Sequence, residues 1–209
     1  MGLALSIPRN DLATSARGDD ALDSGAAIEA FLRDVETRAY RIALLGVRNR
    51  DDALDIVQDA MIRLVRRYAD RPSEQWPPLF YRILQNRIRD VQRRSTVRRR
   101  VLSFFGGMET EDGPDPLLAA PAARGDNPLE RLVAHDAMQA LEQALLRLPA
   151  RQREAFTLRN FEGLDVAQTA EAMSCTEGSV KTHYSRAVHR LRELLGEHGE
   201  EQWNERAAD

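Results

Sequence analysis

The sequence predicts an all-α protein made of two small helical domains joined by a flexible linker. Apolar residues recur at spacings of three and four through most of the 209 residues, and no segment of useful length alternates as a strand does. A stretch at 98–126, rich in glycine, proline and acids, separates two such periodic parts. We expect domains at 26–97 and 127–196, a disordered lead-in at 1–25 and a polar, fraying tail at 197–209.

The first domain is expected to contain three amphipathic helices. The first begins at Ala26 and gives way at Asn49, whose side chain is suited to cap the second helix. The second ends near Tyr68, and Pro77 and Pro78 open the third, because proline is tolerated in the first turn of a helix. The residues expected on the inner sides are Ile28, Phe31, Leu32, Val35, Ala39, Ile42, Ala53, Ile56, Val57, Ala60, Met61, Leu64, Val65, Tyr68, Phe80, Ile83, Leu84, Arg87, Ile88 and Val91.

The second domain is expected to begin with two helices. Asn127 is suited to cap the first of them, and Pro128 then takes its first helical position. Leucines, valine and alanines repeat at helical spacing along this long helix until Pro149 ends it. A short helix at 151–160 follows and leads to Gly163.

The second domain ends in a helix-turn-helix pattern. Asp165 and Gln168 have the spacing of a capping box at the start of a short helix. Ser174 and Cys175 form the turn, and Thr176 can cap a longer second helix. The apolar stripe expected on that second helix is Val180, Tyr184, Ala187, Leu191 and Leu194.

The face opposite this stripe is suited to DNA. Between Gly178 and Arg192 there are four cations, two histidines and no acid, and Lys181 is the only lysine in the chain. An α-helix fits the major groove of duplex DNA, where short polar and cationic side chains near its start reach the base edges. The alternative is the solvated face of an ordinary helical bundle, which the agreement of cap, turn, stripe and acid-free face disfavours.

The net charge of -3 and the isoelectric point of about 5.9 hide a segregated charge distribution. The segment 82–100 holds eight arginines and one acid, whereas the segment 107–126 holds five acids and one arginine. A basic surface beside an acidic linker is consistent with nucleic-acid binding.

The sequence points to a cytoplasmic protein. Its single cysteine, Cys175, excludes a disulfide framework and is expected to be a half-buried structural thiol. No apolar run approaches the roughly 20 residues that a membrane span needs. The first ten residues lack the pattern of a secretory signal, and neither a cofactor nor a metal is expected.

With both halves considered, the chain resembles the extracytoplasmic-function (group four) sigma factors of bacterial RNA polymerase. The segments DDALDIVQDAMIRLVRRY and FYRILQNRIRDVQRR are similar to region two of that family. The segment LPARQREAFTLRNFEGLDVAQTAEAMSCTEGSVKTHYSRAVHRLRELL is similar to region four. The resemblance implies a region-two three-helix bundle, a region-four helix-turn-helix and a protein that is not itself an enzyme.

The resemblance also implies the partners. They are core RNA polymerase, through its beta-prime clamp helices and beta flap, promoter DNA and an anti-sigma factor. The expected core-polymerase surface is Asp52, Asp55, Val57, Gln58, Asp59 and Arg63. The residues expected at the melted minus-ten element are Trp76, Asn86, Arg87, Arg89, Arg93 and Arg94. Those expected at the duplex minus-thirty-five element are Lys181, Thr182, Ser185, Arg186, Arg159 and Arg190, the last two as phosphate contacts.

Several of these residues also have plainer interpretations. Asp51 and Asp52 are suited to stabilise the N-terminal end of a helix dipole, which explains Asp55 and Asp59 less well. A metal site on this helix is disfavoured because no histidine accompanies the acids. The aromatic side chains near the start of the third helix are core candidates: Phe80 and Tyr81 favour the core, and Trp76 fits core or base pocket equally.

Two other functions compete with the sigma-factor interpretation. The Val-Lys-Thr-His motif at 180–183 is similar to LuxR-type regulators, but such a regulator has no need of the Asp-Val-Gln-Asp helix pattern. An enzyme acting on nucleic acid would need a catalytic constellation of serine, cysteine or histidine, and the four histidines are scattered.

Overall fold

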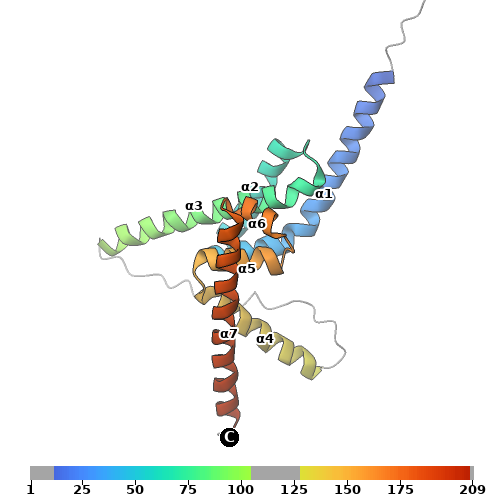
Figure 1. Cartoon of the computed structure of the whole chain (residues 1–209). Helices are drawn as coiled ribbons and strands as arrows, with labels where there is room; N and C mark the ends of the chain where they lie inside the picture. The colour runs from blue at the N-terminus through green and yellow to red at the C-terminus, as the bar shows by residue number, and fades with distance from the viewer. Residues whose placement is uncertain (1–11, 105–127, 208–209) are drawn as a thin grey trace, which may run out of the picture.

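The computed structural model describes residues 12–104 and 128–207, with side-chain environments for 25–95 and 135–196, and these residues are helices and short connections without a strand. This confirms the all-α class (Figure 1). The elements are α1 (Leu12–Val47), α2 (Arg50–Tyr68), the 3-10 turn η1 (Ser73–Gln75), α3 (Trp76–Phe104), α4 (Pro128–Arg147), α5 (Ala150–Asn160), α6 (Val166–Met173) and α7 (Glu177–Ala207). No described helix is long and apolar enough to cross a membrane.

Helices α1, α2 and α3 pack against one another around an apolar centre. The Asn49 side chain accepts a hydrogen bond from the Asp52 N–H at 2.9 Å, which confirms the predicted cap of α2. Most of the expected inner residues are buried or half-buried, but Val65 is 42% exposed and does not belong to the core. Gly46 lets α1 approach α3 closely, because a Cβ there would lie 2.6 Å from Ile88 Cγ2.

The helix-turn-helix of α6 and α7 forms as the local signals predict. Asp165 accepts from the Gln168 N–H at 2.7 Å, and the Gln168 side chain accepts from the Asp165 N–H at 3.0 Å, so the capping box is complete. Ser174 makes the turn in the left-handed region with φ 52°, and Thr176 Oγ1 accepts from the Ser179 N–H at 3.2 Å. The predicted stripe on α7 is buried, apart from Tyr184, which is half-buried.

Three helix ends differ from the expected boundaries. Helix α1 begins at Leu12 rather than Ala26, α3 continues to Phe104, and α7 continues to Ala207. The sequences of these extensions lack a clean apolar period, so periodicity does not predict them. Residues 1–11 of the predicted lead-in, residues 105–126 of the predicted linker and the predicted cap Asn127 lie outside the described residues.

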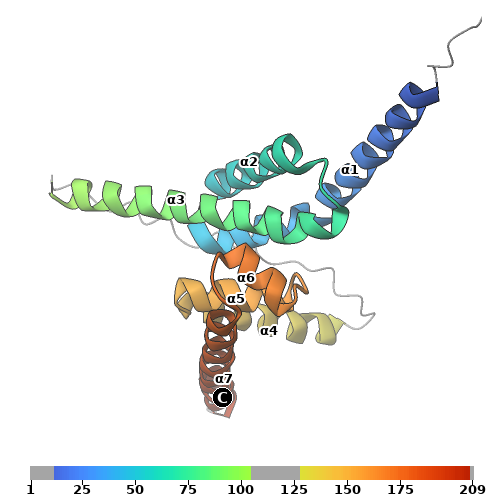
Figure 2. The same ribbon diagram turned by 45° about the horizontal axis from the view of Figure 1, so that its top comes forward.

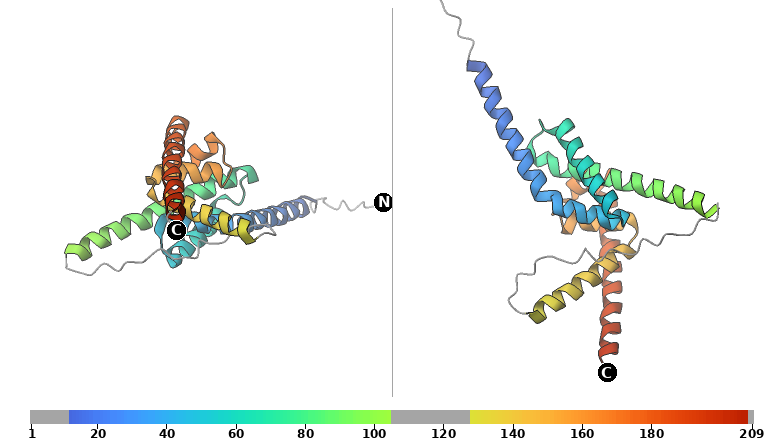
Figure 3. Two further views of the ribbon diagram at one scale, coloured as in Figure 1. Left: turned by 90° about the horizontal axis from the view of Figure 1, so that it is seen from below. Right: turned by 180° about the vertical axis from the view of Figure 1, so that it is seen from behind.

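The two halves of the chain pack against each other instead of standing apart. Figure 2 shows α5 and α6 directly against α1 and α3, and helices α3 and α6 are in contact. Leu45 of α1 lies in one apolar cluster with Leu145 and Leu191 of the second half. Figure 3 shows the N-terminal part of α1 and the C-terminal part of α3 extending away from this packed centre.

Candidate nucleic-acid and protein interfaces

One face of α7 is an open, cationic surface. Lys181, Thr182, Ser185 and Arg186 are all exposed, and no acid interrupts them. The Thr182 hydroxyl donates to the Gly178 carbonyl at 2.9 Å, which leaves its oxygen available as an acceptor. The structure therefore brings four of the six residues expected at duplex DNA onto one accessible patch.

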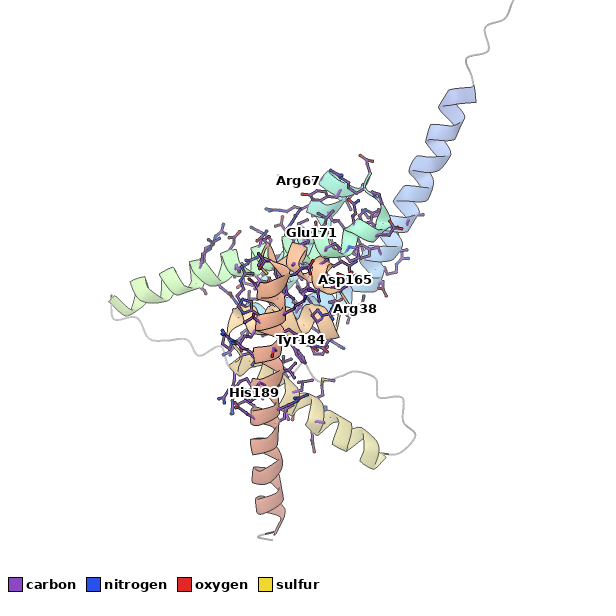
Figure 4. The ribbon with its side chains drawn as sticks, in the orientation of Figure 1. Arg38, Arg67, Asp165, Glu171, Tyr184 and His189 are labelled. Atoms are coloured by element: carbon purple, nitrogen blue, oxygen red, sulfur yellow. The ribbon has the colours of Figure 1, made fainter. Side chains whose placement is uncertain are left out.

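The other two residues of that group make contacts within the second half. Arg159 of α5 donates to the Leu164 carbonyl at 2.6 Å, and its guanidinium lies 5.9 Å from the centre of the Tyr184 ring. Arg190 forms an ion pair with Glu193 at 2.8 Å on the exposed side of α7, next along the chain to His189, which Figure 4 labels. Arg159 thus ties α5 to the start of the helix-turn-helix and lies against a residue of α7.

The basic part of α3 divides into an open and an occupied side. Asn86, Arg93 and Arg94 are exposed, and Arg93 pairs with Asp90, which holds the pKa of that carboxyl below its ordinary value. Arg89 donates to the Asn86 side-chain oxygen at 2.9 Å. Arg87 instead faces α2 and forms an ion pair with its Asp59. The exposed side can serve as a cationic track with an amide on it.

Trp76 lies in the core of the first half. It is 3% exposed, its indole N–H donates to the Tyr68 carbonyl at 3.0 Å, and its ring centroid lies 5.9 Å from that of Phe31. The core interpretation of Phe80 and Tyr81 is confirmed as well, because both are fully buried. In this structure the Trp76 ring is not available to a base, whereas residues 71–75 of the preceding connection are exposed.

The six residues expected at core polymerase separate into three environments on α2. Asp52, Asp55 and Gln58 are exposed near the start of the helix. Asp59 is half-buried between Arg63, at 3.1 Å, and an arginine of α3. Val57 is 4% exposed and belongs to the core, as the apolar period predicts.

An apolar component of the same helix was not among the predicted contact residues. Leu54, Ile62 and Val65 are 49%, 48% and 42% exposed. With Gln58 between them, they follow spacings of four, four and three residues and share one outer face of α2. The signal was present in the sequence, since Leu54 and Ile62 fall outside the phase of the buried stripe.

The remaining candidate groups are the cysteine and any cluster of possible metal ligands. Cys175 is half-buried, and burial raises the pKa of its thiol, which favours the neutral form. In the part of the chain that the structure describes, no three His, Cys, Asp or Glu side chains are grouped to hold a metal ion.

Comparison with known proteins finds two matching families. The family described as "Sigma-70 region 2" matches residues 27–99, and "Sigma-70, region 4" matches residues 138–191. The "ECF RNA polymerase sigma factor SigM" of Mycobacterium tuberculosis is 30% identical over 175 residues, 81% of this chain and 78% of that protein. The "ECF RNA polymerase sigma factor SigX" of Bacillus subtilis is 28% identical over 165 residues, 76% of this chain and 79% of that protein.

Solved structures give the same fold. The sigma factor RpoE in complex with the anti-sigma factor NepR from Bartonella quintana superimposes with a TM-score of 0.58 and 27% identity, covering 80% of this chain and 96% of that one. CnrH in complex with the cytosolic domain of CnrY has a TM-score of 0.51 at 19% identity and covers 85% of this chain and 97% of that one, a likeness of fold alone.

Proposed function

Because this chain belongs to the extracytoplasmic-function sigma factors of bacterial RNA polymerase, we propose that it binds core polymerase in the cytoplasm and directs it to specific promoters. It acts as a specificity subunit and catalyses no reaction itself. The observation that carries the proposal is the pairing, in one chain, of an acid-free exposed face on α7 with a charged and apolar exposed face on α2.

The α7 face reads the minus-thirty-five element as duplex DNA. Lys181, Thr182, Ser185 and Arg186 enter the major groove, where cations favour guanine edges and hydroxyls can bond to any base. Arg190 lies at the rim and contacts phosphate, which fixes register without carrying sequence information. Arg159 supports this face from α5 through its bond to the Leu164 carbonyl.

The exposed side of α3 binds the melted minus-ten strand. Single-strand binding needs a cationic track and groups that hold extruded bases. Arg93 and Arg94 supply the track, and Asn86 can pair with a base edge once Arg89 releases its side-chain oxygen. Trp76 contributes indirectly, because its bond to the Tyr68 carbonyl fixes the exposed connection at 71–75.

The outer face of α2 binds the beta-prime clamp helices of core polymerase. Leu54, Ile62 and Val65 supply apolar area that is desolvated on binding, and Asp55 and Gln58 supply the polar contacts at its side. The second half binds the beta flap. An anti-sigma factor is a further partner, because the similar RpoE was solved with one bound.

In vitro transcription with purified core polymerase and a promoter library tests this function. Wild type is compared with Lys181→Ala/Arg186→Ala and with Arg147→Ala, a control that removes an exposed cation from α4. We expect wild type and the control to initiate from the same promoters and the double variant to lose at least tenfold in initiation, since each base contact contributes about 1–3 kcal/mol. Duplex binding by the chain alone, without polymerase-dependent transcription, would instead indicate a stand-alone regulator.

A further inference from the structure

The two halves of the chain meet at a buried carboxylate, Glu162, in the connection between α5 and α6. Its side chain is only 2% exposed. It accepts a hydrogen bond from Arg38 Nε at 3.0 Å and another from the Tyr81 hydroxyl. Arg38 belongs to α1 and Tyr81 to α3, so both donors come from the other half (Arg38 is labelled in Figure 4).

The connection that carries Glu162 is fixed within the second half. The Phe161 N–H donates to the Thr157 carbonyl at 2.9 Å, and the Leu164 N–H donates to the Leu158 carbonyl at 3.1 Å. These bonds need nothing from the first half. The second half therefore presents the carboxylate on a formed turn, and its burial depends on the contact with α1 and α3.

Both donors are held in the protonated state that this contact needs. Burial, reinforced by the charge of Glu162, raises the pKa of the Tyr81 hydroxyl far above its ordinary value. The hydrogen bond to Asp34 is the first cause that raises the pKa of Arg38, and Glu162 adds to it. With its pKa raised, the Tyr81 hydroxyl stays protonated and donates to the carboxylate in this state.

Weaker polar contacts surround this point. Arg82 of α3 lies 3.7 Å from the Glu171 carboxylate of α6. Arg89 of α3 lies 3.9 Å from Glu154 of α5, which is 5% exposed. Two further arginines of α3 therefore face carboxylates of the second half.

We propose that Glu162 is a latch that holds the isolated chain in a closed state, and that this state must open before a promoter can be used. The requirement that this state opens before promoter use rests on the proposed function. The minus-ten and minus-thirty-five elements lie about 25 base pairs apart, roughly 85 Å along a duplex with about 10 base pairs in each turn of about 34 Å. In the closed state α3 and α6 touch, so the two reading surfaces cannot span that distance.

An ion pair with one buried partner is well suited to a contact that must open. The cost of removing the Glu162 carboxylate from water offsets much of the electrostatic gain, while the Arg38 side chain stays 40% exposed, so the pair fixes one arrangement without making it very stable. On opening, Glu162 regains water, and Arg38 keeps its ion pair with Asp34 at 2.8 Å. The closed fraction lowers the apparent promoter affinity in proportion, because only the open fraction is competent.

The closed state leaves other surfaces accessible. Asp55 and Gln58 on α2 and Lys181 and Arg186 on α7 are exposed while Glu162 is buried. The latch therefore acts on the simultaneous use of both promoter elements rather than on the first encounter with polymerase.

Single-molecule Förster resonance energy transfer between two dyes on the full chain, measured without polymerase, tests the latch. The dyes are attached at Gly25→Cys and Gly196→Cys in a Cys175→Ser background, because a Cβ at either glycine meets nothing within 4 Å. Glu162→Lys places a cation against Arg38 and should raise the open population at least tenfold. Tyr81→Phe removes one donor and keeps the ring, and should raise it about tenfold, the value of a hydrogen bond to a charged group.

The matched control is Glu29→Lys, which breaks the exposed Arg33–Glu29 pair within α1. It should leave the open population unchanged, and far-ultraviolet circular dichroism should show that all variants keep the helical content of wild type. If Glu162→Lys and Tyr81→Phe retain the wild-type transfer efficiency, the latch is overturned.

A transcription arm with core polymerase separates the latch from the proposed function. We expect Glu162→Lys to reach half-maximal transcription at a concentration several-fold below that of wild type. If the variants open but transcribe no better than wild type, the inhibitory role is overturned. If wild type drives no transcription but Glu162→Lys still changes the energy transfer, the promoter function is overturned and the contact between the halves is supported.

Discussion

At the scale of single residues, two signals predicted where the site residues lie: the apolar period and the family resemblance. The two signals disagree at some positions. The apolar period places Val57 on the buried side of α2, whereas the family resemblance places it on the polymerase-binding surface. In the structure Val57 is only 4% exposed, as the apolar period predicts. Trp76, for which core and base pocket were equal alternatives, is buried with its indole N–H bonded to a carbonyl. Polar residues such as Asp55, Asn86 and Lys181 are exposed as expected, because nothing in the fold compensates their desolvation.

The burial of Val57 and the exposure of Leu54 predict opposite effects of substitution on stability and on polymerase binding. Val57→Ala removes buried methyl groups and should lower the free energy of unfolding by roughly 1–3 kcal/mol, with little direct effect on polymerase affinity. Leu54→Ser changes a side chain that is 49% exposed and should leave stability within about 0.5 kcal/mol while weakening polymerase binding. Urea unfolding and titration with core polymerase measure the two effects. A reversed pattern would place Val57 rather than Leu54 at the interface.

At the scale of elements, local signals predicted the helices well. The cap at Asn49 and the capping box of Asp165 and Gln168 depend on neighbours within three residues, so they can be read from sequence. The early start of α1 at Leu12 could not be found from periodicity, because residues 12–25 are mostly polar or small and show no apolar repeat. The outer face of α2 was missed because Val65 fits the buried stripe nearly as well as the exposed one.

The approach of α1 to α3 predicts contrasting effects for two glycines of one helix. Gly46→Ala forces its Cβ against Ile88 and should cost roughly 1–3 kcal/mol of stability, more than the gain in helix propensity. Gly25→Ala meets nothing within 4 Å and should gain about 0.5–1 kcal/mol. Chemical unfolding of both variants measures the difference. Equal stabilisation by both would mean that α1 and α3 lie further apart than the structure has them.

At the scale of the whole molecule, the sequence predicted two domains but not their contact. Glu162 contacts Arg38 and Tyr81, which lie 124 and 81 residues away in the sequence, and no local pattern predicts contacts at that separation. Nor does periodicity reveal that Leu45 of α1 joins the apolar cluster of α4 and α7. Pairings of this kind depend on the shapes of two finished surfaces, which is why the order of helices was predictable and their closed packing was not.

The proposed function requires that two surfaces of this chain, carried together by polymerase, read two separated promoter elements. Selection of duplexes from a random library, with and without core polymerase, tests it most directly. We predict that sequencing will show two enriched elements about 25 base pairs apart only when polymerase is present, and that Lys181→Ala/Arg186→Ala will remove the upstream element alone. A single element enriched equally by the chain without polymerase would contradict the claim.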